Sequence, residues 1–384
     1  MGVEAGRRAI LEELRLHKPG SRLVAFFFSA LVYAARGCSL PQPPAVPPAL
    51  TPVQLVESGH ILRAKAALTP VVEAEPSNDK AAWLLSKSLF GLGDLDGALK
   101  YAERAVSLAG DNADYHAQLG AVLGRMAEKA SIFKQLGLAR RTRKELEAAV
   151  ALDPRNLDGL MGVMLYYFSA PSFLGGDKAK AAEFAARIAA VDKARGWMAR
   201  AALAREQKDA AAELDFSLRA VAEDPGNFDA QSELADYYLG RPEPDYSKLE
   251  ETGCKLLEID PGRPDGWRVL AEVHVASYCW TELAGILETS ERFNPEDLSP
   301  HYAAAAAMLR KEERMSAARE YLDKYLAQPP EGSQPSHAMA RCQLATLLEK
   351  EQHPDEAVAQ LELALQEDPS LEAAKKDLKR LKGK

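Results

Sequence analysis

Proline recurs along this chain at a regular spacing, and each proline in the pattern follows an acidic or amide residue. These dipeptides are Glu75-Pro76, Asp153-Pro154, Asp224-Pro225, Asp260-Pro261, Asn294-Pro295, Gln328-Pro329 and Asp368-Pro369. The steps from Pro261 to Pro295 and from Pro295 to Pro329 are both 34 residues. Proline cannot continue an α-helix and restricts the residue before it, so each pair marks a helix end. A chain punctuated in this way is expected to repeat one helical unit.

Apolar residues within the units recur at helical spacing. Residues 82–93 read AWLLSKSLFGLG, in which Ala82, Leu85 and Leu89 fall on one helix face and Ser86 is small where a neighbouring helix must approach. The same pattern recurs in Leu119, Gly120 and Leu123, in Leu234, Ala235 and Tyr238, in Trp267, Leu270 and Ala271, and in Leu344, Ala345 and Leu348. This periodicity predicts a second amphipathic helix in each unit.

Together, these features resemble the tetratricopeptide-repeat family. Its unit carries an apolar residue, Leu-Gly, an aromatic residue, a central Gly, two spaced Ala and a terminal Pro. The resemblance covers roughly 45–371 in about nine units, near 45–78, 79–112, 113–156, 157–193, 194–229, 230–263, 264–297, 298–337 and 338–371. It implies an all-α fold, a right-handed α-α superhelix or solenoid of helix pairs. We expect the array over 53–371 and a C-terminal capping helix with a basic tail over 372–384.

The N-terminal segment is expected to lie outside the array. Residues 23–35, LVAFFFSALVYAA, form an uncharged apolar run of 13 residues that follows several basic residues. A membrane-spanning helix needs about 20, so the run is typical of a secretory signal. We expect a signal peptide or lipoprotein signal over 1–38. Residues 39–52, six of them proline, are then expected to form an extended tether.

Two alternatives stay open for this segment. Ala35-Arg36-Gly37-Cys38 resembles the lipobox of bacterial lipoproteins, in which the cysteine is lipidated, but Arg36 departs from that motif. Cleavage near Ala34 or Ala35 by the ordinary signal peptidase is the rival to lipidation of Cys38. A buried N-terminal helix in a cytoplasmic protein is the rival to export.

Two insertions depart from the 34-residue unit. The third unit is about ten residues too long, so its helices within 124–154 are expected to run longer than usual. The fourth unit contains YYFSAPSFLGGDKAKA at 166–181. Its irregular residues are Pro171, Phe173, Gly175, Gly176 and Asp177. We interpret them as a tight turn that ends in a helix N-cap and leaves Phe173 exposed; phosphate binding is disfavoured because no P-loop Lys-Ser/Thr follows.

No catalytic spacing is present in the sequence. It lacks HExxH, GxSxG and CxxC, and its seven histidines are scattered without a metal-ligand spacing. We therefore predict no catalytic residue, no metal and no cofactor, and a protein that is not an enzyme. A net charge of −8 argues against a nucleic-acid partner.

In tetratricopeptide proteins the first helix of each unit lines a concave groove that commonly binds a peptide or partner helix. The residues expected to project there are Trp83, Lys87, Phe90, Phe168, Asp236, Arg268, Tyr302 and Arg310. Such a mixture of aromatic and charged residues suits protein recognition. Packing against the adjacent unit explains Trp83 and Tyr302 equally well.

The sequence thus predicts a protein-binding scaffold of the bacterial cell envelope, periplasmic or membrane-anchored through its N-terminus. The alternative is a ligand-binding accessory lipoprotein, because the Gly-Gly-Asp turn is similar to one in the periplasmic T component of TRAP transporters. A closed apolar cavity lined by 166–176 would favour that alternative.

Overall fold

The structure is a computed structural model that describes residues 40–42, 50–333 and 335–383. Its contacts separate Met1–Leu40 from Pro41–Lys384, and the fold described here is that of the second unit. The predicted signal over 1–38, its candidate lipidation site Cys38, and most of the predicted tether lie outside the described residues.

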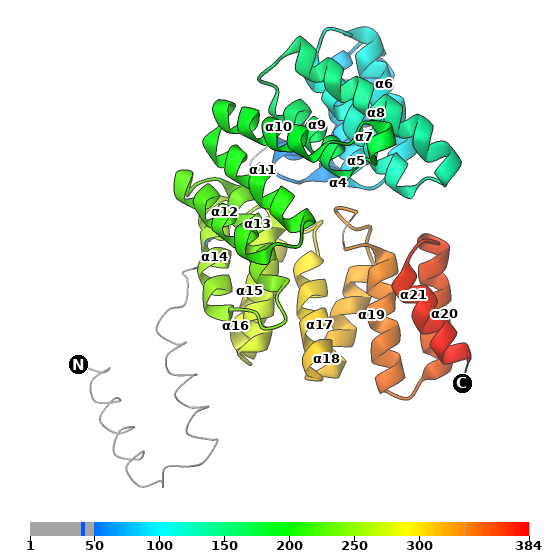
Figure 1. Cartoon of the computed structure of the whole chain (residues 1–384). Helices are drawn as coiled ribbons and strands as arrows, with labels where there is room; N and C mark the ends of the chain where they lie inside the picture. The colour runs from blue at the N-terminus through cyan, green and yellow to red at the C-terminus, as the bar shows by residue number, and fades with distance from the viewer. Residues whose placement is uncertain (1–39, 43–49, 334, 384) are drawn as a thin grey trace, which may run out of the picture. The chain divides into compact units, whose positions relative to one another are not determined.

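Within the described residues the regular elements are helices, which follow one another as consecutive pairs (Figure 1). The first helices are α3 (Pro52–Glu57), α5 (Asp79–Gly91), α7 (Ala113–Lys129), α9 (Leu157–Ser169), α11 (Lys193–Glu206), α13 (Phe228–Leu239), α15 (Pro264–Ala276), α17 (Ser299–Lys311) and α19 (His337–Lys350). Their partners are α4 (Ile61–Ala74), α6 (Leu95–Leu108), α8 (Ile132–Leu152), α10 (Lys178–Val191), α12 (Ala210–Glu223), α14 (Tyr246–Ile259), α16 (Trp280–Phe293), α18 (Met315–Leu326) and α20 (Pro354–Glu367). A short 3-10 helix, η2 (Ser172–Leu174), follows α9, and α21 (Glu372–Lys382) ends the array. The predicted all-α solenoid of about nine helix pairs is confirmed.

The helices α5 to α7 and α9 to α14 each begin at an Asn or Asp, whose side-chain oxygen accepts a hydrogen bond from an otherwise unpaired backbone N–H. Asn78 Oδ1 accepts from the Ala81 N–H at 2.9 Å, and Asp94 Oδ1 accepts from the Gly97 N–H at 2.9 Å. Gly93, with φ of +80°, turns the chain between those two helices. These caps place the helix boundaries that the proline pattern predicts.

Small residues let the helices of a pair approach closely. Ala98, Ala102 and Ala105 of α6 are almost fully buried, and Ser86 Oγ of α5 donates to the Ala98 carbonyl at 2.8 Å. At the contact of α10 and α11, a Cβ added to Gly196 would lie 2.3 Å from the Ala189 Cβ. The helix axes there could not stay as close with any larger residue.

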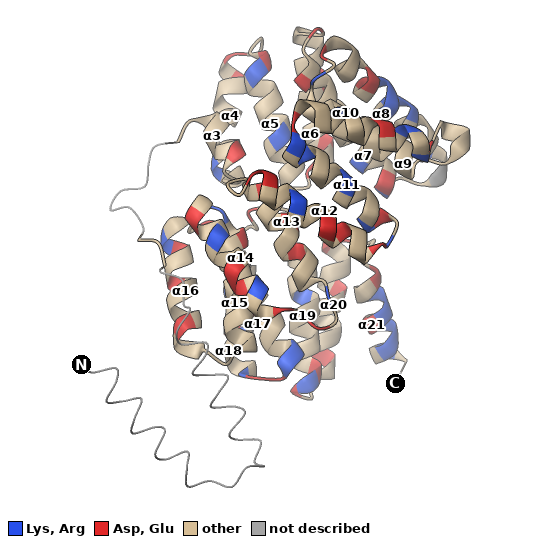
Figure 2. Cartoon of the chain, turned by 60° about the vertical axis from the view of Figure 1, so that its left-hand side comes forward, with Lys and Arg blue, Asp and Glu red and all other residues tan. Residues whose placement is uncertain are grey.

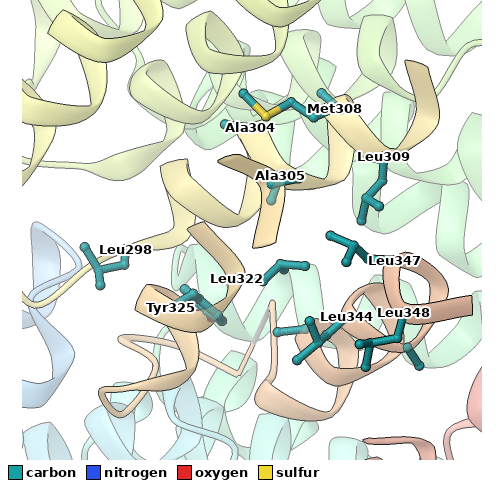
Figure 3. Packing of buried hydrophobic residues seen from close by; sticks show 14 of the residues in the cluster. Leu298, Ala304, Ala305, Met308, Leu309, Leu322, Tyr325, Leu344, Leu347 and Leu348 are labelled. Carbon is teal, nitrogen blue, oxygen red and sulfur yellow. The ribbon is translucent and has the colours of Figure 1, made fainter. Parts of the chain in front are cut away.

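The C-terminal pairs share one continuous apolar core. Its members come from α15 to α21, and Figure 3 shows Leu322, Leu344 and Leu347 gathered between α18 and α19. Leu378 and Leu381 of α21 pack against the edge of this core. Helix α21 therefore covers an apolar face that α20 would otherwise expose to water.

The first pairs also contact loops near the other end of the sequence. Glu331 Oε1, between α18 and α19, accepts from the Leu62 N–H at 3.1 Å, and the Ser333 N–H donates to the Gly91 carbonyl at 2.8 Å. Arg63 Nε lies 3.6 Å from Glu296 Oε2, between α16 and α17. We call these contacts the seam.

Among the described helices, none is both long and apolar enough to cross a membrane.

Candidate interaction face

Charged side chains link the first helices of successive pairs into a ladder. Its members lie on or beside α11, α13, α15 and α17, and they are Arg195, Arg205, Asp229, Glu233, Asp236, Arg263, Arg268, Glu272 and Arg310. We call this set the charged ladder. Figure 2 shows acidic and basic residues interspersed over these helices. The ladder exists because equivalent positions of adjacent units lie side by side in a stacked array.

Ion pairs connect most rungs of the ladder. Asp229 on α13 forms ion pairs with Arg195 of α11 and with Arg263, which precedes α15. The nitrogen–oxygen distance is 3.2 Å in each pair. Arg310 Nη2 on α17 lies 2.5 Å from Glu272 Oε2 on α15. These pairs fix the charged side chains across unit boundaries.

Arg268 is the exception. It projects from α15 within electrostatic range of Asp236, Glu272 and Asp297, and it opposes the upward pKa shift of each carboxyl. Yet no carboxylate in the described part of the chain comes within ion-pair distance of its guanidinium. A half-buried guanidinium without an ion-pair partner can bind an acidic group of another molecule.

Burial raises the pKa of several ladder carboxyls. Desolvation raises the pKa of Glu233 to about 7. Arg205 Nη2, 4.0 Å from Glu233 Oε2, only partly opposes this shift. Burial raises the pKa of Asp236 and Glu272 as well. The Asp236 side chain is nevertheless exposed, so a partner's polar group could reach it.

The predicted aromatic residues are more tightly packed than the ladder. On α5, Trp83 lies half-buried with its ring 5.8 Å from that of Tyr115 on α7, and Lys87 Nζ lies 5.0 Å from the Trp83 ring. Phe90 is half-buried against the N-terminal core. Packing against the adjacent unit thus accounts for Trp83, as one of the two interpretations expects.

Phe168 and Tyr302 lie apart from that group. Lys178 Nζ lies 5.1 Å from the centre of the Phe168 ring on α9. The Tyr302 ring on α17 lies 5.6 Å from that of Tyr325. The structure therefore brings Asp236, Arg268, Tyr302 and Arg310 onto neighbouring helices and places Trp83, Lys87 and Phe90 on a different part of the array. Binding by these residues stays a prediction.

The irregular loop after α9 is a hydrogen-bonded turn. Pro171 precedes η2, Gly175 has φ of +91°, and a Cβ added to Gly176 would lie 1.7 Å from the Ala170 carbonyl oxygen. Asp177 caps α10 by accepting from the Ala179 and Lys180 N–H groups. Both glycines and Asp177 thus have local structural roles.

A solvent-open hollow of about 390 Å³ lies elsewhere, between the α6–α7 and α8–α9 loops. Its lining is mostly polar, and Asn112, Asn156 and Asp114 there already cap helices or bond to each other. This is not the apolar cavity at 166–176 that would favour a ligand carrier. Among the described residues, no cluster of His, Cys, Asp and Glu is arranged to hold a metal ion.

Comparison with known proteins identifies the repeat. The sequence profile of the tetratricopeptide repeat matches residues 54–115, from α3 to the start of α7. Over these residues the chain thus carries the tetratricopeptide repeat that its sequence predicts. Repeat proteins of this kind generally use their extended surfaces to bind protein partners. No functionally curated protein matches the sequence.

The solved structures that match this chain have low sequence identity. A thermophilic tetratricopeptide-repeat protein of Thermus thermophilus is 19% identical, with a TM-score of 0.43 over 49% of this chain and 95% of its own. Yeast Tom70 is 16% identical, with a TM-score of 0.47 over 86% of this chain and 80% of its own. The hetero-tetramer of Cut9 and Hcn1 gives 15% identity and a TM-score of 0.43, over 84% of this chain and 59% of that one.

Sequence reasoning missed six ladder members, namely Arg195, Arg205, Asp229, Glu233, Arg263 and Glu272. A signal for two of them was present. Glu233 precedes Asp236 by three residues and Glu272 follows Arg268 by four, so each shares a helix face with a residue that was predicted. Arg205 has no such neighbour among the predicted residues.

Proposed function

We propose that this protein is an interaction scaffold of the bacterial cell envelope, and that it holds a partner peptide or helix on the face formed by the first helices of its repeats. Within that face, the charged ladder with Arg268, Asp236 and Arg310 is the contact region. Aromatic Tyr302 borders it and adds apolar area.

One observation carries this proposal: Arg268 is half-buried among carboxyls but pairs directly with none of them among the described residues. A purely structural ladder would be expected to pair this guanidinium as it pairs Arg195, Arg263 and Arg310. An acidic group of a partner would complete the arrangement.

The test is a pull-down from envelope extracts with the full-length chain as bait, compared with Arg268→Glu. Charge reversal at this position breaks no ion pair within the described residues but adds a negative charge beside Asp236, Glu272 and Asp297, so far-UV circular dichroism and a second variant, Arg268→Gln, check that the fold persists. The matched control is Arg319→Glu on α18, a residue of comparable exposure that pairs with Glu351.

Loss of the captured proteins in Arg268→Glu, but not in Arg319→Glu, is the expected result. If both variants retain them, the ladder is not the contact region. If no protein is captured and native mass spectrometry detects a small molecule instead, the scaffold proposal is wrong and the ligand-carrier alternative replaces it.

Export rests on the apolar run at 23–35 and on Cys38. We expect the chain to fractionate with the envelope and Cys38→Ser to shift it from the membrane to the soluble periplasmic fraction. An N-terminal peptide that still begins at Met1 by mass spectrometry would contradict export.

A further inference from the structure

The two insertions of the sequence meet in the structure. Helix α8 is 21 residues long, the longest described, and the irregular loop with η2 packs beside it. A Cβ added to Gly175 would lie 2.4 Å from Arg143 Nη1, and the Tyr167 hydroxyl donates to Glu147 Oε1 at 3.0 Å. Two departures from the repeat, about 30 residues apart in sequence, therefore build one surface.

This surface displays large apolar side chains. Phe133 on α8 is 90% exposed, Leu136 is 38% exposed, and Phe173 in η2 is 75% exposed. Phe133 and Leu136 are three residues apart and share a helix face with Arg140 and Lys144. We call Phe133, Leu136, Arg140, Lys144 and Phe173 the strip.

The strip is also strongly basic. Between Arg125 and Lys144 the chain has seven Lys or Arg and one acidic residue, whereas the whole chain carries a net charge of −8. Figure 2 shows the basic residues grouped along α8. Arg125, Arg141 and Arg143 pair with glutamates, but Lys134, Arg140 and Lys144 are exposed and have no ion-pair partner among the described residues.

From this juxtaposition we propose that the strip is a membrane-contacting surface: Phe133, Leu136 and Phe173 enter the headgroup region of an anionic bilayer while Arg140 and Lys144 bind its phosphates. Apolar side chains bracketed by long cationic ones are the composition of interfacial helices. Cations near an anionic leaflet each strengthen binding, and their alkyl stems can bury while the charge stays at the headgroups.

Geometry favours a bilayer over a protein partner. The apolar residues lie on a helix face and an adjoining turn, and Phe133 and Phe173 stand largely free of the rest of the protein. A protein interface concentrates its free energy in a packed, fully desolvated centre, which this strip lacks. A bilayer accepts isolated Phe and Leu side chains because lipid rearranges around each one. This inference is independent of the charged ladder and of lipidation at Cys38.

The test must report on the strip itself, because the segment at 23–35 could bind vesicles on its own. Full-length protein carrying Phe133→Trp is mixed with vesicles of phosphatidylcholine and phosphatidylglycerol that contain bromine-labelled acyl chains, which quench nearby tryptophan. The unsubstituted protein supplies the background from Trp83, Trp197, Trp267 and Trp280. Leu218→Trp on α12, at a site 45% exposed, is the matched control.

We expect the tryptophan at position 133 to be quenched and the one at position 218 not. Adding Arg140→Glu and Lys144→Glu should raise the lipid concentration needed for half-maximal quenching about tenfold or more. Vesicles of phosphatidylcholine alone should quench little. Equal quenching at positions 133 and 218 would overturn the proposal. The proposal would also be overturned if vesicles did not quench the tryptophan at position 133 but a synthetic acidic amphipathic peptide shifted its emission. The strip would then be a protein docking site.

Discussion

The helix pairs from α15 to α20 and those from α7 to α10 differ in how far they bury large and charged side chains. The first group buries its large side chains and several carboxyls: Trp267 is 1% exposed, and Glu331 in the α18–α19 loop is 5% exposed. The second group exposes Phe133, Phe173 and most of its cations. The regular unit of α15 and α16 thus keeps Trp267 inside the stack, whereas the two units with insertions leave Phe133 and Phe173 exposed.

The largest expected effect is at Trp267. Its indole Nε1–H donates to the Pro261 carbonyl at 2.8 Å, and its ring packs 5.7 Å from that of Phe293. Trp267→Ala should lower the free energy of unfolding by about 3–5 kcal/mol, because it leaves a cavity and an unpaired carbonyl. Urea unfolding followed by circular dichroism measures this loss. Phe133→Ala should change stability by less than about 0.5 kcal/mol, and similar losses in both variants would erase the contrast between the groups.

A second, pH-dependent effect is expected at Glu331, where desolvation raises the pKa to about 8 from an ordinary value of 4.5. The folded protein then keeps a proton that the unfolded chain releases, so the group costs little at pH 4 and destabilises increasingly as pH rises from there toward 8. Glu331→Gln keeps an oxygen for the Leu62 N–H and removes the ionisation. It should stabilise by about 4 kcal/mol at pH 8.5 and hardly at all at pH 4.

Urea midpoints of Glu331→Gln and the unsubstituted protein at the two pH values give this difference directly. Other groups titrate in the same range, Glu233 among them, but they are common to both proteins and cancel. A gain of equal size at both pH values would mean that Glu331 is not held protonated in the seam.

The smallest effect sharpens the comparison at Gly137 of α8. An added Cβ there would meet nothing within 4 Å, and the same holds for Gly285 of α16. Gly→Ala at an open position in a helix should stabilise each by about 1 kcal/mol. Thermal unfolding of both variants checks this. A gain at 285 without one at 137 would show that the exposed half of α8 is less helical in solution than its counterpart.

Sequence alone predicts the fold well and the site only partly. Proline spacing and the 3.6-residue period locate the helix pairs, and Asp177 was recognisable as a cap, because all of these are local properties of the chain. The sequence could not show that, within the described residues, Arg141 is paired while Arg140 and Arg268 are not. Whether a cation is paired depends on residues such as Glu103, 38 positions from Arg141, which only the stacking brings near.

The seam has a consequence for synthesis. Helix pairs of this kind form from contacts within a few dozen residues, so each can fold soon after it leaves the ribosome. Leu62, however, bonds to Glu331, 269 residues later. At roughly 5–20 residues per second, translation separates these two residues by about 10–50 s. During that interval the start of the chain exposes backbone groups and Arg63 without their final partners, and a nascent chain that stalls before residue 331 leaves them uncovered.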